Sequence, residues 1–444
     1  MSQSPQVPQQ NLPTIPVQPF RIDVPLHKLL QNAPDLPVHL IQAKEPAELL
    51  SLPTPVFPQH PELIHELDGA DIEAHESTLR NGKRDWPASR IWDNMKGWMF
   101  PYFKSRLLPG DFQPIIAYLF TDWKCNLDCH YCWSYDNRVK GMSEDTARRA
   151  IDWLHETPCR VLAPTGGEPL LRPDFVHRVV YYAAKKGFWV YLATNGRLLR
   201  PEVTDRLADA GIATINFACD CINEKPGLPK AFEHVKSHFE YLVKRQYRYG
   251  YTMFFNTNIC RNNIDDVKQL AEIAHDNGIA ITFHINEAPM MEQKDFKHFR
   301  DNSTYIYPED FPVVDDLLDW LCEKQRRGWK MVDSVARLQN MKGFMRGVGE
   351  HWGCRAGQNW LIIRTNGTLA PCFPMYNAKY DWGTVADHKF DTKQLLEMKQ
   401  GCEPHCFSTL GYNIAYCYST TRVMKWLFKQ ARRGFQGVTG SFED

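Results

Sequence analysis

Thr121-Asp122-Trp123-Lys124-Cys125-Asn126-Leu127-Asp128-Cys129-His130-Tyr131-Cys132-Trp133 brings three cysteines together at C-x3-C-x2-C spacing. An apolar run at residues 115–120 lies directly before this stretch and predicts a strand. Three thiolates in one short loop can bind a single metal centre. A closed structural zinc site takes four protein ligands, whereas a cluster held by three cysteines leaves one iron open for another ligand. The number three therefore favours a cluster with an open iron position.

The composition predicts an ordinary soluble globular protein. The chain has 444 residues, of which 43% are hydrophobic and 23% are charged, and its formal net charge is zero. This length suits two domains or one barrel with attachments, and the zero net charge gives no reason to expect nucleic acid as a partner. Thirteen cysteines without an N-terminal secretion signal favour reduced thiols and metal binding. No apolar run reaches the roughly 18 residues of a membrane span, so we expect a cytoplasmic protein.

The first 110 residues differ in composition from the rest of the chain. Thirteen of the thirty prolines lie before residue 62, between Gln-rich and short apolar pieces. Such a segment favours extended or polyproline II conformations over a packed core of its own. Aromatic residues between 86 and 103 provide enough apolar surface to pack on the following domain. We therefore expect an extension at 1–110 that wraps the core, a barrel at 111–330 and a Cys-rich domain at 331–444.

From residue 114 onward, short apolar runs alternate with amphipathic segments of helix length. The expected strands are residues 116–120, 160–163, 189–193, 214–218, 251–255 and 279–283. The expected helices are residues 143–155 with Ser143 as N-cap, 174–186 ended by Gly187, 202–210, 231–245, 264–277 and 311–326. Strict alternation favours parallel strands with right-handed crossovers, and hence an α/β barrel or an open α/β sheet.

Chemistry in such folds lies on the loops that follow the carboxyl ends of the strands. A polar or glycine-rich cluster follows each expected strand, namely the cysteine loop, Gly166-Gly167-Glu168-Pro169, Thr194-Asn195-Gly196, Asp220, Asn256 with Asn258, and His284 with Glu287. Two glycines let the backbone approach a ligand closely, and Glu168 can accept hydrogen bonds from a cationic amine. We expect these loops to face one mouth of the fold.

Further candidates lie at the same strand ends. Cys219 and Cys221 flank Asp220, and each is either a thiol that donates a hydrogen atom or, as the more ordinary interpretation, a small buried hydrophobe. Cys260 and Arg261 are candidates for contact with substrate or cofactor, as are His284 and Glu287.

The cysteine loop and the Gly-Gly-Glu-Pro turn together resemble the radical S-adenosylmethionine (radical SAM) superfamily. The resemblance spans about residues 114–290, and its two motifs are specific in combination. It implies a partial (β/α)6 TIM-type barrel in which Cys125, Cys129 and Cys132 hold a [4Fe–4S] cluster. S-adenosylmethionine would bind the fourth iron, and one electron would cleave it to methionine and a 5′-deoxyadenosyl radical that abstracts a substrate hydrogen. A zinc site completed by His130 or a distant cysteine is the alternative.

The resemblance also implies roles for residues at other strand ends. The Gly166–Pro169 turn would bind the methionine ammonium, and Tyr131 would lie beside the adenine. Asp220 would contact the ribose or serve as a catalytic carboxylate, with a structural hydrogen-bonding role as the alternative. The implied cofactor-binding set is Tyr131, Gly166, Gly167, Glu168, Asn195 and Asp220.

Five cysteines lie in the last hundred residues, which is too many for chance core packing in a reduced compartment. Thr365-Asn366-Gly367-Thr368 predicts a tight turn between two short strands. With Gly367-x4-Cys372, this region resembles the SPASM and twitch extensions that carry auxiliary [4Fe–4S] clusters, although the dense cysteine run of the full SPASM pattern is missing. One auxiliary cluster is therefore expected, with a zinc site as the alternative. The expected ligands are Cys354, Cys372, Cys402 and Cys406, with Cys417 as a substitute.

The predicted function is that of a radical SAM oxidoreductase or maturase-type enzyme acting by hydrogen abstraction on a peptide, a protein or a small metabolite. Oxidation, crosslinking and rearrangement all fit, and an electron donor such as flavodoxin or ferredoxin is expected. A non-catalytic iron–sulfur or zinc protein is the rival hypothesis. The basic, amphipathic segment at 422–435 either caps the core or makes a peripheral membrane contact.

Overall fold

The computed structural model describes residues 112–132, 140–286, 297–298, 301–348, 352–376, 381–403, 406, 411–412 and 414–415. The predicted extension at 1–110 and the predicted basic helix at 422–435 lie outside these residues, as do Cys417 and Glu287. Within the described segments, no helix is long and apolar enough to cross a membrane.

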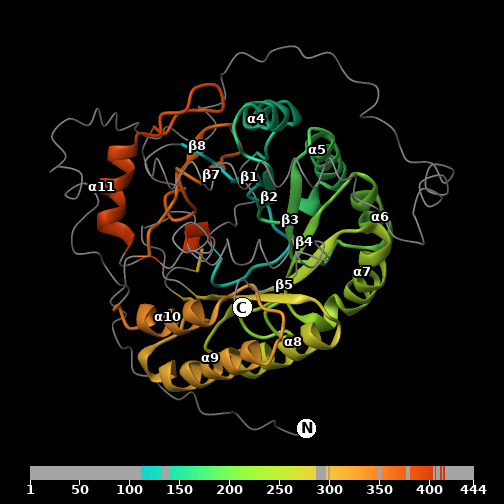
Figure 1. The fold of residues 1–444 in the computed structure, drawn as a ribbon. Coiled ribbons are helices and arrows are strands. Elements are labelled where there is room, and N and C mark those ends of the chain that lie inside the picture. The colour runs from blue at the N-terminus through green and yellow to red at the C-terminus, as the bar shows by residue number, and fades with distance from the viewer. Residues whose placement is uncertain are drawn as a thin grey trace, which may run out of the picture.

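Six parallel strands follow one another across the main sheet in the order β6-β5-β4-β3-β2-β1 (Figure 1). They are β1 (Ile116–Asp122), β2 (Val161–Gly166), β3 (Trp189–Thr194), β4 (Thr214–Ala218), β5 (Thr252–Ile259) and β6 (Ala280–Ile285). Each strand pairs in parallel with the next one along the chain, which requires a crossover between them. The prediction of a partial TIM-type barrel is confirmed.

Helices form an arc on the outer side of these strands (Figure 1). They are α4 (Glu144–Glu156), α5 (Pro173–Lys185), α6 (Pro201–Asp209), α7 (Lys236–Tyr249), α8 (Ile264–Asp276) and α9 (Phe311–Arg326). The predicted N-cap of α4 is confirmed, because the side chain of Ser143 accepts a hydrogen bond from Thr146 N at 3.0 Å. The buried residues of α4 include Ala147, Ala150, Ile151 and Leu154, whose spacing places them on one helix face.

The helix expected at 231–245 begins later and ends later than the sequence suggests. A 3-10 turn, η4 (Phe232–His234), comes first, and α7 starts at Lys236. The segment before it folds back on itself, with Asp220 N donating to Lys230 O at 2.9 Å. This local bonding uses backbone groups that a longer helix would have needed.

Strand β5 extends four residues beyond the expected end. Asn256 and Asn258 belong to it and pair in register with Thr282 and His284 of β6. Pairing with β6 satisfies the backbone groups of this segment, so tertiary context overrides the low strand propensity of asparagine.

The chain after α9 returns to the barrel sheet. Following α10 (Val335–Met345), strand β7 (Trp360–Ile363) pairs in parallel with β1, and β8 (Leu369–Ala370) pairs antiparallel with β7. The predicted tight turn joins β7 to β8, with Gly367 at a φ of 83°. The hairpin therefore completes an eight-stranded sheet, and α11 (Thr392–Cys402) follows it. The boundary proposed near residue 330 stays a prediction.

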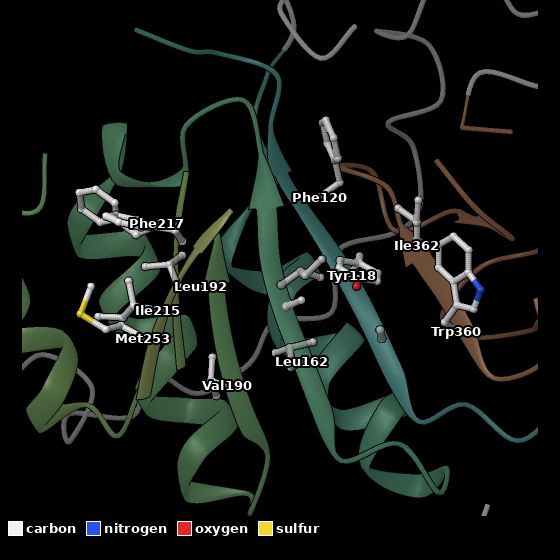
Figure 2. Close-up of a cluster of buried hydrophobic side chains, with 14 of the residues drawn as sticks. Tyr118, Phe120, Leu162, Val190, Leu192, Ile215, Phe217, Met253, Trp360 and Ile362 are labelled. Atoms are coloured by element: carbon white, nitrogen blue, oxygen red, sulfur yellow. The ribbon is translucent and has the colours of Figure 1, made fainter. Parts of the chain in front are cut away.

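One hydrophobic core spans the barrel and the hairpin. Figure 2 shows side chains of β1 to β5 in a layer that continues to Trp360 and Ile362 of β7. Tyr118 of β1 contacts Trp360 edge to face, with ring centroids 6.0 Å apart. Shared burial of this kind stabilises the attachment of β7 to the barrel edge.

Candidate active site

The cysteine loop leaves the end of β1 and is bonded to the turn that follows β2. Gly167 N donates to Asp122 O at 2.8 Å, and Glu168 N donates to Lys124 O at 2.8 Å. A Cβ atom at Gly167 would overlap the carbonyl oxygen of Lys124. The glycine is therefore required by the close approach of the two loops, which brings the predicted ammonium-binding turn against the cysteine loop.

Glu168 ties the ends of β2 and β3 together. Its side chain is 1% exposed, its Oε1 accepts from Thr194 Oγ1 at 2.8 Å, and its Oε2 accepts from Asn195 N at 2.8 Å. Burial raises the pKa of this carboxyl. Asn195 in turn donates from Nδ2 to Asn126 Oδ1 at 2.8 Å and lies 4.0 Å from Cys125 Sγ. Glu168 thus orients the residue that contacts the cysteine loop, and its binding of an ammonium stays a prediction.

The three thiols of the loop are near neighbours. Cys129 is buried, whereas Cys125 and Cys132 are partly exposed. Burial raises the pKa of the Cys125 thiol to about 12, with the charge of Cys132 adding to the rise, and burial also raises the pKa of Cys129. No group of three or more cysteine, histidine or carboxylate side chains in the described chain is arranged to hold a single metal ion. Three thiols on one loop are the donor set of a [4Fe–4S] cluster with an open iron, so these residues fit that group.

The partly buried Tyr131 and the buried Asp220 form a hydrogen-bonded pair beside the thiols. Tyr131 Oη donates to Asp220 Oδ2 at 2.5 Å, and Asn258 N donates to Asp220 Oδ1 at 2.8 Å. Lys230 Nζ donates to Tyr131 Oη at 2.7 Å. Burial raises the pKa of Asp220, while the charge of Lys230 lowers it. The two predicted cofactor contacts, Tyr131 and Asp220, are therefore brought together, and both oxygens of Asp220 are already bonded within the protein.

Residues 124–299 match the family model described as the radical SAM superfamily. They form a radical SAM domain. Domains of this family bind a [4Fe–4S] cluster and S-adenosylmethionine, which agrees with the cysteine loop and its neighbouring turns.

Known proteins similar to the chain support the same conclusion. An AdoMet-dependent heme synthase of Methanosarcina barkeri is 27% identical over 271 residues, which are 56% of this chain and 73% of that protein. An AdoMet-dependent heme synthase of Nitratidesulfovibrio vulgaris is 27% identical over 169 residues, which are 36% of this chain and 44% of that protein, so the match spans less than half of this relative. A crystal structure of SuiB from Streptococcus suis shares the fold, with a TM-score of 0.50, 13% identity, and coverage of 69% of this chain and 76% of that chain. The prediction of an enzyme is confirmed.

Other predicted candidates of the radical SAM domain have mixed surroundings. Cys219, Cys221 and Cys260 are fully buried, as the small-hydrophobe interpretation expected for the first two. His284 lies in β6, where burial lowers its pKa to about 3 and keeps it neutral near pH 7. Arg261 lies 3.2 Å from Asp310 in a surface ion pair. The guanidinium of Arg261 is therefore directed to this surface pair, and its predicted contact with substrate or cofactor stays a prediction.

A second group of cysteines lines one cavity near the radical SAM domain. Cys354, Cys372, Cys402 and Cys406 all border it, together with Trp352, Trp360, Met398, Lys399 and Glu403. The charges of Cys354 and Cys402 raise the pKa of the Cys372 thiol further than burial alone does. Four thiols from separate segments therefore border one cavity, and their role as cluster ligands stays a prediction. Cys417 lies outside the described residues.

Sequence reasoning missed two lysines, of which Lys399 is buried and Lys230 is partly buried. Lys230 lies beside the first cysteine group, and Lys399 lies beside the second. Neither position carries a sequence motif. Lys399 lies three residues before Cys402 on α11, and this helical spacing is the one sequence feature that could have indicated its proximity to the second cysteine group.

Proposed function

We propose that this radical SAM enzyme abstracts a hydrogen from a substrate carbon and holds an auxiliary [4Fe–4S] cluster in the cavity of the second cysteine group. Oxidation of the substrate fits best, because an auxiliary cluster can take up the electron that the substrate radical releases. Crosslinking and rearrangement are the other outcomes that hydrogen abstraction allows.

The first cysteine group would act with S-adenosylmethionine. When bound to Cys125, Cys129 and Cys132, the cluster supplies the electron that cleaves the sulfonium and generates the hydrogen-abstracting radical. The protein's own residues position the loop: Glu168 orients Asn195 against it, and the backbone contact at Gly167 holds the neighbouring turn against the cysteine loop. Since burial raises the pKa values of Cys125 and Cys129, cluster binding must release these protons and becomes easier as pH rises.

The observation that carries the auxiliary cluster is the convergence of four cysteines on one cavity. Cys354 precedes β7, Cys372 follows β8, Cys402 ends α11, and Cys406 lies just beyond. A chance placement of buried cysteines would not direct four thiols from these separate segments to a common space. Four thiolates are the usual ligand set of a [4Fe–4S] cluster. A zinc ion is the less favoured occupant, because the described thiols are not arranged to hold a single metal ion.

Lys399 supports a strongly negative occupant of this cavity. Its Nζ donates to Gln358 Oε1 at 2.7 Å, and the residue is 3% exposed. A buried ammonium is costly without compensating charge, and four thiolates would provide that charge. Burial lowers the pKa of Lys399, whereas the charges of Cys354 and Cys402 oppose this shift.

The substrate proposed first is a tetrapyrrole, and the electron donor is a flavodoxin or ferredoxin. The tetrapyrrole is favoured among small metabolites because two relatives are named as heme synthases. A peptide or protein substrate, expected from the resemblance of the C-terminal region to SPASM and twitch extensions, is the second candidate. The two are distinguished by which compound raises the release of 5′-deoxyadenosine.

The test is anaerobic reconstitution followed by reduction with S-adenosylmethionine present. Two four-iron clusters predict about eight irons per chain, and reduction should release 5′-deoxyadenosine. Cys129→Ala should abolish the release, and Cys372→Ala should spare part of it while removing about four irons. Cys322→Ala, at a buried cysteine of α9, is the matched control and should change neither quantity. Equal iron content and equal activity in Cys372→Ala and the wild type would contradict the auxiliary cluster.

A further inference from the structure

The loop between β4 and α7 lies against the cysteine loop. The turn at Gly227 in the β4–α7 loop is bonded to the backbone of the cysteine loop, because His130 N donates to Gly227 O at 3.0 Å. The two ends of the β4–α7 segment are also bonded to each other, because Lys230 O accepts from Asp220 N at 2.9 Å. These two backbone bonds place Lys230 beside the thiols independently of its side chain.

The side chain of Lys230 is held at a defined point. Its Nζ donates to Tyr131 Oη at 2.7 Å, lies 5.1 Å from the centre of that ring, and lies 4.0 Å from Asp220 Oδ2. The side chain is 20% exposed, so little solvent screens its charge. Tyr131 directly precedes Cys132 in the sequence, so the ammonium is fixed relative to the cluster-binding loop.

The surroundings of Lys230 are rich in acidic groups. Asp220 and Glu168 are both about 1% exposed, and three thiolates join them when a cluster is bound. Burial acts to lower the pKa of Lys230, yet the charges of Cys129 and Asp220 outweigh it and raise the pKa overall. The same ammonium acts electrostatically on Cys125 and Cys129, whose pKa values it lowers against the effect of burial. Lys124, beside Cys125 in the sequence, is exposed to solvent.

We propose that Lys230 is the counter-cation of the cluster bound by Cys125, Cys129 and Cys132, and that its charge raises the reduction potential of that cluster. One-electron reduction adds a negative charge to the cluster, and a cation fixed nearby in a poorly solvated site stabilises the reduced state. Net charge, hydrogen bonding and exposure are known determinants of iron–sulfur potentials. Lys230 is therefore a positioning and tuning residue, and it acts before any substrate binds. The proposal rests on cluster binding at the first cysteine group and not on the substrate.

The test is a redox titration of the cluster-loaded full chain, followed by electron paramagnetic resonance without S-adenosylmethionine. It is made in the Cys372→Ala background, so that a second cluster does not overlap the signal. Lys230→Met should shift the midpoint potential to more negative values, and Lys230→Arg should restore most of the shift. Tyr131→Phe, which removes the hydrogen bond that places the ammonium, should give a smaller negative shift. Lys124→Met is the matched control, because it removes an equal charge at a screened position and should leave the potential unchanged.

An unchanged potential in iron-loaded Lys230→Met would overturn the proposal. So would weaker binding of S-adenosylmethionine with an unchanged potential, because Lys230 would then be a cofactor ligand. If Lys230→Met does not retain iron, Lys230→Gln and Lys230→Arg decide the matter. Iron loss in the two neutral variants with retention in Lys230→Arg supports the charge role, and loss in all three shows a packing role instead. The redox titration needs no substrate, so its result does not depend on whether the proposed substrate is turned over. The proposed function and the role of Lys230 can therefore be contradicted independently.

Discussion

Trp123 and Tyr376 pack edge to face, with ring centroids 5.2 Å apart and an interplanar angle of 84°. Trp123 lies two residues before Cys125, and Tyr376 follows Met375, which lines the cavity of the second cysteine group. Phe120 completes the contact, at 5.1 Å from Trp123 and 4.7 Å from Tyr376. The two cysteine regions are therefore joined through a buried aromatic cluster.

Loss of the Tyr376 ring should weaken both regions together. Tyr376→Ala leaves a cavity between β1 and the segment after β8, and we expect a loss of about 3–5 kcal/mol in the free energy of unfolding. Denaturant unfolding under anaerobic conditions measures the change. Tyr376→Phe keeps the ring and should cost only about 1 kcal/mol. A Tyr376→Ala protein as stable as the wild type would show that the aromatic contact does not hold the segments together.

The ion pair of Arg337 and Asp333 should be far more important for stability than a surface pair. Both side chains are at most 1% exposed, and Asp333 Oδ2 accepts from Phe283 N at 2.6 Å on the edge strand β6. Arg337→Met leaves a buried carboxylate without its charge partner, so a loss of about 3–5 kcal/mol is expected. The matched control is Arg346→Met, which removes a half-exposed pair with Asp315 and should cost less than about 1 kcal/mol. Similar unfolding free energies for the two variants would contradict this difference.

The sequence predicts those features that depend on neighbours along the chain. The strand before Cys125, the N-cap at Ser143 and the tight turn at Gly367 were all predicted correctly, because each follows from the chemistry of a few adjacent residues. The number of cysteines in the last hundred residues suggested a shared ligand, and the structure places four of them around one cavity; their binding of a cluster stays a prediction.

Features that depend on distant partners could not be predicted in this way. Strand β7 has only four residues, and it forms by pairing with the edge of β1, a strand that lies far away in the sequence. Asn256 and Asn258 were expected in a loop because their strand propensity is low, and pairing with β6 decides otherwise. Lys230 contacts Tyr131 because its loop folds against the cysteine loop, and no local sequence pattern predicts this contact.

His177 should make the stability of the fold depend on pH. Burial in α5 lowers the pKa of His177 to about 4, with the charge of Arg206 contributing, whereas the unfolded chain has the ordinary value near 6.5. The unfolded state therefore binds the proton more readily, and stability is present above the unfolded pKa and is lost as pH falls toward the folded pKa. Between pH 7.5 and 5.5 the loss should be about 1–2 kcal/mol. His177→Gln should flatten this part of the profile, and equal slopes in denaturant unfolding of the two proteins would count against the assignment.

The contact at Gly167 should be necessary for cluster binding. An added Cβ would overlap the carbonyl oxygen of Lys124, and backbone cannot move aside as a flexible side chain can. Gly167→Ala should therefore displace the cysteine loop, remove most of the iron bound there and abolish the release of 5′-deoxyadenosine. Gly343→Ala in α10 is the matched control, because its added Cβ would lie 3.4 Å from the nearest atom, Val348 O. Iron content and 5′-deoxyadenosine release are measured after anaerobic reconstitution, with Cys372→Ala as a common background. The added methyl group can be accommodated only if the two loops move apart. Retention of iron and activity in Gly167→Ala would therefore show that cluster binding tolerates this separation, and would contradict the prediction.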